Sequence, residues 1–208
     1  MDKISREVSG DLMKLLGTLK KGLIFVISAP AGTGKTTLVR MLIKEFDCVV
    51  ENISYTTRSI RPQEIEGRDY YFITKEAFQK KIEEKEFLEY AEVFGSYYGT
   101  SKYTIDKICS SGKHVVLIID TQGAEQLRGV LDAVYIFICP PNLAELEQRL
   151  HGRKSDTPAA ITTRLSWAKK EIEASKRYDY KIVNENLTTA YEVLRSIFIA
   201  EEHRNRLN

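Results

Sequence analysis

The feature that most constrains the fold is the segment LIFVISAPAGTGKTTLVRML at residues 23–42. An apolar run leads into a loop of small residues, and the loop leads into a segment with helical periodicity that begins at Lys35. Two more apolar runs, VVLIID at 115–120 and VYIFIC at 134–139, are typical of strands buried on both faces of a parallel sheet. Helices are predicted over 35–45, 122–129, 142–150 and 159–178. This alternation predicts an α/β fold whose ligands bind beyond the carboxyl ends of the strands.

The loop between the first strand and its helix approximates the phosphate-binding pattern G-x-x-x-x-G-K-[ST]. Its glycines let the backbone wrap around a phosphate, Lys35 adds a cation, and Thr36 offers a hydroxyl to a magnesium ion. Ala29 replaces the first glycine, which the loop tolerates if the backbone keeps a negative φ there, and Pro30 favours an extended conformation at that point. A glycine-rich turn without a ligand is the alternative interpretation. The predicted triphosphate-binding residues are Ala29, Pro30, Ala31, Gly32, Thr33, Gly34, Lys35, Thr36 and Thr37.

Composition and charge limit the class of partner. The 208 residues include 31 Lys and Arg against 29 Asp and Glu, a net charge of +2, which argues against binding to nucleic acid or to a membrane surface. The length suits one domain with a small inserted lobe. Cys48, Cys109 and Cys139 form no C-x-x-C pair and are interpreted as small core residues in a reducing cytosol. The first residues lack the apolar run of a signal peptide, so we expect a cytoplasmic protein.

Three further motifs accompany the loop: SYTTRSIRPQEIEGRDYYF at 54–72, FLEYAEVFGSYYGTS at 87–101 and IIDTQGA at 118–124. Together they resemble the guanylate kinase family in its bacterial branch, over about 22–205. The resemblance implies a P-loop nucleoside monophosphate kinase fold, with a parallel sheet core flanked by helices, a small mixed α/β GMP-binding lobe and a helical lid. It implies transfer of the γ-phosphoryl group of ATP to GMP, and to dGMP, giving ADP and GDP in purine nucleotide metabolism, with Mg²⁺ as cofactor.

The resemblance also implies a division of the chain. The core would comprise 22–53 and 105–208, with the lid at about 149–165 inside it. The GMP-binding lobe would be 54–104, where short strands, some of them antiparallel, are expected. Outside the range of the resemblance, the leucine pattern itself predicts that residues 1–21 form an amphipathic extension, with Leu12, Leu15, Leu16 and Leu19 on roughly one face. This extension is expected to pack on the domain or on a twin subunit, so we expect a monomer or a homodimer.

The GMP site implied by the resemblance has a phosphate end and a base end. Arg58 and Arg61 would hold the phosphate, because two guanidinium groups give multiply bonded recognition that lysines could not match. Glu89 would accept from N1–H and N2–H₂ of guanine, whereas adenine would leave it facing an acceptor, at a cost on the order of 2 kcal/mol. Solvated surface charges are the alternative for all three residues. The implied GMP-binding residues are Ser54, Arg58, Arg61, Glu64, Tyr70, Glu89, Tyr98, Gly99, Thr100 and Asp120.

Catalysis would rest on cationic side chains, because phosphoryl transfer consists mainly of positioning and charge stabilisation. The implied catalytic set is Lys35, Arg58, Arg149, Arg153 and Arg164, the last three being lid arginines that close over the triphosphate. Exposed helix charges are the alternative for these three. Asn184 matches a residue beside the adenine of ATP, and its alternative is to cap the following helix. The histidines His114, His151 and His203 are isolated and are interpreted as structural or surface residues.

The sequence departs from the family pattern at two positions. Asp120 ends the run VVLIID, where it would lie near GMP and reach the metal through water, but the second acid common two residues earlier is Ile118. The lid motif G-R-G is GRK here, with Lys154 in place of glycine. We expect Thr36 and the phosphates to hold most of the metal, so that activity survives both changes.

Two other functions compete with a guanylate kinase. One is a guanylate-kinase-like module that binds phosphorylated peptides without catalysis, against which the intact GTGKTT and the lid arginines count. The other is a related kinase for another small phosphate, such as a ribose bisphosphate, which would not need Glu89 and Thr100 to read a base.

Overall fold

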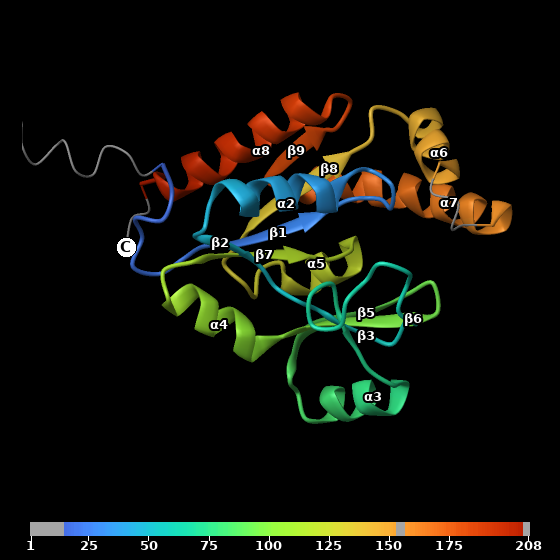
Figure 1. The fold of residues 1–208 in the computed structure, drawn as a ribbon, viewed down its shortest axis with the longest axis horizontal. Helices are drawn as coiled ribbons and strands as arrows, with labels where there is room; N and C mark the ends of the chain where they lie inside the picture. Colours follow the sequence, from blue (N-terminus) through green and yellow to red (C-terminus); the bar gives the residue numbers. More distant parts are fainter. Residues whose placement is uncertain (1–14, 153–156, 206–208) are drawn as a thin grey trace, which may run out of the picture.

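The core of the molecule is a five-stranded sheet in which all neighbouring strands are parallel (Figure 1). The computed structural model describes residues 15–152 and 157–205. The strand order is β2 (Val49–Glu51), β7 (His114–Ile118), β1 (Ile24–Ser28), β8 (Val134–Cys139) and β9 (Tyr180–Val183). The α/β fold with a parallel core sheet, expected from the apolar runs, is confirmed.

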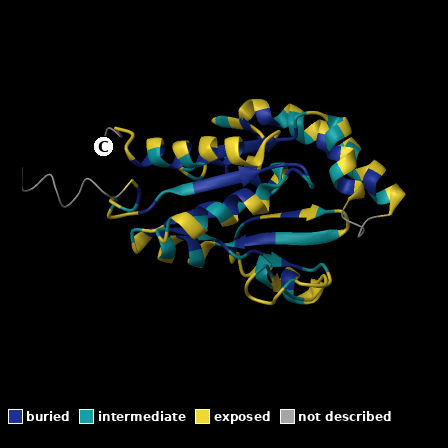
Figure 2. Ribbon diagram, turned by 45° about the horizontal axis from the view of Figure 1, so that its top comes forward, coloured by how far each residue is buried: buried dark blue, intermediate teal, exposed yellow. Residues whose placement is uncertain are grey.

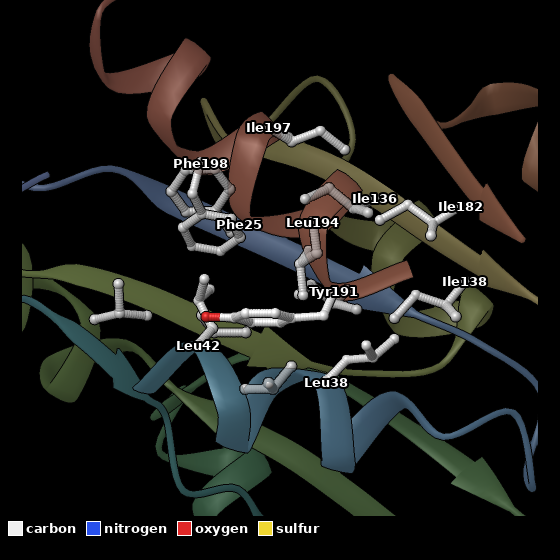
Figure 3. Close-up of a cluster of buried hydrophobic side chains, with 14 of the residues drawn as sticks. Phe25, Leu38, Leu42, Ile136, Ile138, Ile182, Tyr191, Leu194, Ile197 and Phe198 are labelled. Atoms are coloured by element: carbon white, nitrogen blue, oxygen red, sulfur yellow. The ribbon is translucent and has the colours of Figure 1, made fainter. Parts of the chain in front are cut away.

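Helices cover both faces of this sheet, because the side chains of each strand are buried on alternating sides. On one face lie α2 (Lys35–Glu45) and α8 (Leu187–Glu202), and on the other α4 (Lys102–Ser110) and α5 (Thr121–Leu127). In β1, Phe25 and Ile27 join the first apolar cluster, whereas Val26 joins the second. Figure 2 shows strands of the sheet as buried and the outward helix faces as exposed. Figure 3 shows side chains of β1, α2 and α8 packed on one another, with Phe25 stacked on Phe198.

A second, smaller sheet forms a lobe beside the core. Its strand order is β4 (Tyr71–Phe72), β3 (Tyr55–Thr56), β6 (Ser96–Ser101) and β5 (Phe87–Val93). β6 is antiparallel to β3 and β5, as expected for this region, whereas β3 and β4 are parallel. The helix α3 (Lys75–Glu83) buries Phe78 against the rings of Phe87 and Tyr97, which gives the lobe its own apolar centre.

Two helices span most of the predicted lid region, α6 (Leu143–His151) and α7 (Pro158–Ala174). They pack through an apolar cluster that includes Leu146, Leu150 and Ile161, and Ala31 of the phosphate loop packs against the same cluster. The two helices are therefore attached to the loop that precedes α2. Arg153 and Lys154 lie outside the described residues, so the structure gives no account of the GRK departure. No helix in the described ranges has the length and apolar character needed to cross a membrane.

Some expected element boundaries were wrong by a few residues. The strand expected at 115–120 ends at Ile118, because Asp120 instead caps α5 by accepting the Gly123 N–H at 2.8 Å. The helix expected at 122–129 is Thr121–Leu127, and the one expected at 142–150 is Leu143–His151, capped by Asn142. The helix expected at 159–178 ends at Ala174 and continues as a 3₁₀ turn over Ser175–Arg177. The helix expected at 35–45 is confirmed.

The described part of the N-terminal extension is not an amphipathic helix. Residues 15–20 have no helical structure, and Leu15 is 47% exposed while Leu16 is buried in the first core cluster. The expectation of one shared apolar face is therefore wrong for these two residues. Leu16 packs on the chain's own core, and Leu12 lies outside the described residues.

A buried polar network fixes residues 17 and 18 to the end of α8. The Glu202 carboxylate accepts from the N–H of Gly17 at 2.8 Å, the N–H of Thr18 at 2.7 Å and Nε2 of His114 at 2.5 Å. Nδ1 of His114 accepts from Leu23 N–H at 3.0 Å, which leaves the ring proton on Nε2 for Glu202. His114 is thus a structural residue, as interpreted from the sequence, but it is not isolated. Burial alone would raise the pKa of Glu202, but the hydrogen bonds outweigh burial and lower it to about 2.

We expect Glu202→Gln to lower the free energy of unfolding by about 2 kcal/mol, because one amide oxygen cannot serve the buried donors that two carboxylate oxygens serve. The stabilisation by an acid with a lowered pKa is complete above its ordinary pKa of 4.5 and is lost as the pH falls towards about 2. The difference between the two proteins should therefore shrink below pH 4.5. Urea unfolding at several pH values measures this, with the exposed Glu192→Gln on α8 as control. Equal stability of Glu202→Gln and the control at pH 7 would contradict the prediction.

Candidate active site

A cavity at the carboxyl end of β1 gathers most of the residues singled out in the sequence. It is bounded by the phosphate loop on one side, the small lobe on another and α7 on a third. The sequence-predicted residues that line it are Ala29, Pro30, Ala31, Gly32, Thr33, Gly34, Lys35, Thr36, Thr37, Ser54, Arg61, Tyr70, Glu89, Tyr98, Gly99, Asp120 and Arg164. The carboxyl end of a parallel sheet is where the strand pattern placed the ligand site.

The phosphate loop has the backbone conformation that its glycines allow. Gly32 and Gly34 have φ values of 93° and 89°, in the left-handed region where a side chain would be strained. Ala29 is not among the described non-glycine residues with positive φ, so its expected tolerance in place of glycine is confirmed. The first turn of α2 contains no acidic residue, and no side chain caps it within the described structure. The helix N-terminus is therefore available to an anion.

The side chain of Asn184 is hydrogen-bonded to the backbone of this loop. The side chain is 4% exposed, and its amide donates to the Thr33 carbonyl at 2.6 Å. A Cβ on Gly34 would lie 2.6 Å from the Asn184 amide nitrogen, so glycine is required there for space as well as for φ. The alternative role of Asn184 as a helix cap is wrong, because Asn186 caps α8.

Arg149 is anchored beside the loop in this structure. Its Nε donates to Glu145 at 3.0 Å, and its Nη1 donates to the Asn184 carbonyl at 3.0 Å. It is not among the residues that line the cavity, unlike Arg164 of α7. Arg149 therefore joins α6 to the segment that holds the phosphate loop.

Arg58 is held in a two-point ion pair with Glu64. The guanidinium donates to the two carboxylate oxygens at 2.8 and 3.1 Å, and Glu64 also accepts the Arg61 N–H at 2.8 Å. Burial opposes ionisation of Glu64, but these hydrogen bonds outweigh it and lower its pKa. Arg58 also lies 5.5 Å from the ring centre of Tyr70. Glu64 thus fixes Arg58 against Tyr70, and Arg58 and Glu64 are not among the residues that line the cavity, whereas Arg61 and Tyr70 are.

A β-bulge brings Glu89 opposite Thr100. The pairing of β5 with β6 shifts between Phe87 and Glu89, so that Leu88 is an extra residue. Glu89 is 4% exposed, and burial raises its pKa to about 7 against the opposing effect of the Thr100 hydroxyl. The Thr100 hydroxyl is close enough to Glu89 to lower its pKa, and it has no other hydrogen-bond partner in the described part of the chain. Glu89 lines the cavity, whereas Thr100 is fully buried and is not among the lining residues.

Gly123 makes room for the Glu89 carboxylate. A Cβ at Gly123 would lie 2.3 Å from Oε2 of Glu89 and 3.5 Å from Oδ1 of Asp120. Only glycine therefore lets the first turn of α5 approach these carboxylates so closely. Asp120 lines the cavity through the cap that begins α5, rather than through the end of a strand.

Comparison with known proteins shows the family of the chain. The family model described as guanylate kinase matches residues 21–201. The chain belongs to the guanylate kinase family. It is 52% identical to the guanylate kinase of Protochlamydia amoebophila, over 92% of this chain and 98% of that protein. It is also 52% identical to the guanylate kinase of Chlamydia felis, over 88% of this chain and 91% of the relative.

Solved structures agree with this assignment. A crystal structure of guanylate kinase from Anaplasma phagocytophilum matches with a TM-score of 0.74 and 32% identity, over 92% of this chain and 91% of that one. A structure of TT1252 from Thermus thermophilus shares the fold, with a TM-score of 0.51 and 14% identity, over 87% of this chain and 98% of that one. As a member of the guanylate kinase family, the protein is a nucleoside monophosphate kinase, which is a phosphotransferase.

Sequence reasoning missed several residues that line this guanylate kinase cavity, among them Phe94, Trp167 and Glu171. Trp167 and Glu171 follow Arg164 at intervals of three and four residues, so all three share one face of α7. That spacing could have predicted them once Arg164 was singled out. Burial raises the pKa of Glu171 to about 7, while Lys35 acts in the opposite direction. The interaction between Lys35 and Glu171 joins segments far apart in the sequence, so the residues around Lys35 do not predict it.

We expect Gly123→Ala to displace the Glu89 carboxylate and lower its pKa from about 7 towards the ordinary value of 4.5, since the displaced group gains solvent. Nuclear magnetic resonance of the side-chain carboxyl carbon measures this, with Glu89→Gln to assign the signal. Gly152→Ala is the matched control, because its nearest new contact is an ordinary 3.6 Å. An unchanged Glu89 titration in Gly123→Ala would show that the carboxylate does not need this space.

Proposed function

We propose that the protein transfers the γ-phosphoryl group of ATP to GMP, and to dGMP, giving ADP and GDP. The observation that carries the proposal is that the phosphate loop and the buried Glu89 line the same cavity. One element suits a triphosphate and the other suits a base that offers two hydrogen-bond donors. A cavity that combines both matches a reaction between two nucleotides.

The donor side of the proposed reaction is the loop and the start of α2. Backbone N–H groups and the helix dipole would hold the ATP phosphates, and Lys35 would add a charge that follows them during transfer. In the free protein the Lys35 amine lies 3.5 Å from the Ala29 carbonyl oxygen, within the loop. The predicted contact of Asn184 with adenine is replaced in this proposal by its support of the loop.

The acceptor side is the small lobe. Arg61, Tyr70 and Tyr98 line the cavity and would bind the GMP phosphate, with Arg58 held ready behind them by Glu64. Guanine would give the buried Glu89 carboxylate two donors in addition to the neighbouring Thr100 hydroxyl. Adenine offers an acceptor at that edge, so AMP would leave the carboxylate unpaired.

The residues present fit a magnesium ion that arrives with ATP. Thr36 and Asp120 line one cavity and offer the oxygen atoms that Mg²⁺ prefers. No group of three His, Cys, Asp or Glu side chains suited to a metal occurs in the described ranges, so phosphate oxygens would supply most of the ligands. The bound ion would neutralise charge on the transferred group. Thr36 would bind it directly and Asp120 through water.

The transfer itself would need positioning and positive charge rather than a strong base. Lys35 and Arg164 line the cavity from opposite elements, the loop and α7, so they can approach the reacting phosphates from two sides. Arg153, which lies outside the described residues, and Arg149 are proposed to assist when the lid closes.

The competing functions account for less of this cavity. A phosphopeptide-binding module would not require the complete phosphate loop that lines it. A kinase for a small sugar phosphate would gain nothing from a carboxylate at 4% exposure in this cavity, where burial disfavours its charge.

The proposal is tested by ADP formation with GMP, dGMP, AMP or no acceptor. We expect turnover with GMP and dGMP and little with AMP, because only guanine offers hydrogen-bond donors to Glu89.

Glu89→Gln should lower kcat/KM for GMP about tenfold or more, since it removes a charged hydrogen bond. Lys35→Ala is the control that retains GMP binding by calorimetry but loses transfer. Absence of GMP-dependent turnover in the wild-type protein would refute the proposal.

We also expect GMP affinity to fall as the pH falls below about 7, by up to about tenfold per pH unit. The reason is that the free protein holds Glu89 partly protonated near neutral pH, whereas guanine binds the ionised form and must release that proton. Calorimetry in buffers of different ionisation enthalpy measures both the affinity and the proton release.

Glu89→Gln isolates the contribution of this side chain to the pH dependence. The GMP phosphate titrates equally with both proteins, so the difference between their pH profiles reports Glu89 alone. Parallel profiles for the two proteins would contradict the assignment of Glu89 to the base.

A further inference from the structure

The tip of the β5–β6 hairpin has an unusual residue. Val93 pairs with Ser96, so Phe94 and Gly95 form a two-residue turn, with φ values of 51° and 77°. Such turns favour Asn or Gly, because both positions need a left-handed backbone. A bulky side chain in this conformation is an outlier that local structure does not explain. Phe94 is also 48% exposed, so burial in its own lobe does not explain it either.

The ring of Phe94 instead contacts helix α7. Its centroid lies 5.2 Å from that of Trp167, at an interplanar angle of 54°, and the Arg164 guanidinium carbon lies 5.7 Å from the Phe94 centroid. Figure 1 shows that the hairpin and α7 are separate elements, far apart in the sequence, whose ends lie on the same side of the molecule. Phe94, Trp167 and Arg164 all line the cavity. The contact therefore spans the cavity from the small lobe to α7.

We infer that Phe94 and Trp167 form an aromatic clasp that joins the small lobe to α7 and positions Arg164 over the cavity. Aromatic pairs at this separation and tilt attract one another beyond the area that they bury. The face of Phe94 also attracts the Arg164 guanidinium, which limits the positions that this long side chain samples. The clasp compensates for the unfavourable turn conformation of Phe94. Phe94 and Trp167 are positioning residues, because they act through Arg164 and through the approach of the two lobes.

The clasp links the two halves of the proposed reaction. β5 carries Glu89 on the lobe side of the contact, and α7 carries Arg164 and Glu171 on the other. The contact of Phe94 with Trp167 therefore limits the separation between the Glu89 carboxylate and Arg164. The kinetic part of this inference rests on the proposed GMP kinase activity, but the contact itself does not.

The decisive variant is Phe94→Asn. Asn suits the left-handed turn, so the hairpin should keep its stability while the clasp is lost. Trp167 is the single tryptophan of the chain, which makes its fluorescence a direct reporter of the contact. We expect emission at longer wavelength and stronger quenching by acrylamide in Phe94→Asn than in the wild type. We expect kcat and kcat/KM for GMP to fall together by roughly twofold to tenfold, as the loss of an aromatic pair predicts.

A control variant, a second clasp variant and a double variant complete the test. Tyr103→Asn removes a 76% exposed aromatic ring from α4, away from the cavity residues, and should change neither Trp167 emission nor kcat. Trp167→Leu should reproduce the kinetic loss of Phe94→Asn, and the double variant should lose no more than either single variant. Urea unfolding should show that Phe94→Asn is as stable as the wild type.

Several results would overturn the inference. Unchanged Trp167 emission and quenching in Phe94→Asn would show that the clasp does not form in solution. Altered emission with unchanged kcat, or additive losses in the double variant, would show that the contact does not position Arg164. If the wild type lacks GMP-dependent turnover, the proposed function fails, but the fluorescence comparison still decides whether the clasp exists.

Discussion

The hydrogen bond from the Asn184 amide to the Thr33 carbonyl fixes the phosphate loop, and the arrangement of the site depends on it. It ties the loop after β1 to the segment after β9, so two parallel strands that are not neighbours hold one loop between them. Gly34 permits the close approach, and the Asn184 carbonyl in turn accepts from Arg149 of α6. The phosphate loop, the sheet and the first helix of the predicted lid are thereby connected through a single buried residue, by its side chain on one side and its backbone carbonyl on the other. A loop fixed in this way can bind phosphate without first paying the entropy of ordering itself.

The cavity concentrates polar groups whose partners the free protein does not supply in full. Glu89 and Glu171 both have raised pKa values because burial disfavours their charge, and they lie around a loop built for anions. Such groups destabilise the empty site and are satisfied when a complementary ligand enters. Glu64 shows the opposite case, since its ion pair with Arg58 is already complete. The site thus combines an ion pair that is complete in the free protein with buried carboxyl groups whose ionisation is disfavoured there.

The sequence predicted those features of the fold that depend on residues close together in the chain. The apolar runs gave the parallel strands, and the glycines of the phosphate loop gave the positions where left-handed backbone occurs, because both depend on residues close in sequence. Contacts between distant segments could not be predicted in the same way. Nothing near Glu202 in the sequence indicates that it contacts His114 and Thr18. Similarly, the sequence does not distinguish Arg149, which pairs with Glu145, from the cavity-lining Arg164. Phe94 was not singled out in a motif interpreted for Glu89, Tyr98 and Thr100, because its unusual turn conformation and its contact with Trp167 appear only in the structure.

The β-bulge at Leu88 has a consequence for how substrate choice can change. Within β5, the residue opposite Thr100 is decided by the number of residues in the strand as well as by their identity. Regular pairing continued from Phe87–Ser101 would place Leu88, an apolar side chain, opposite Thr100 and would move Glu89 opposite Gly99. A slip of one residue in register would then remove the carboxylate from the position proposed to bind the base, while every polar residue of the motif stayed in the chain. The proposed specificity therefore depends on the register of β5 with β6, which a comparison of residue types alone would overlook.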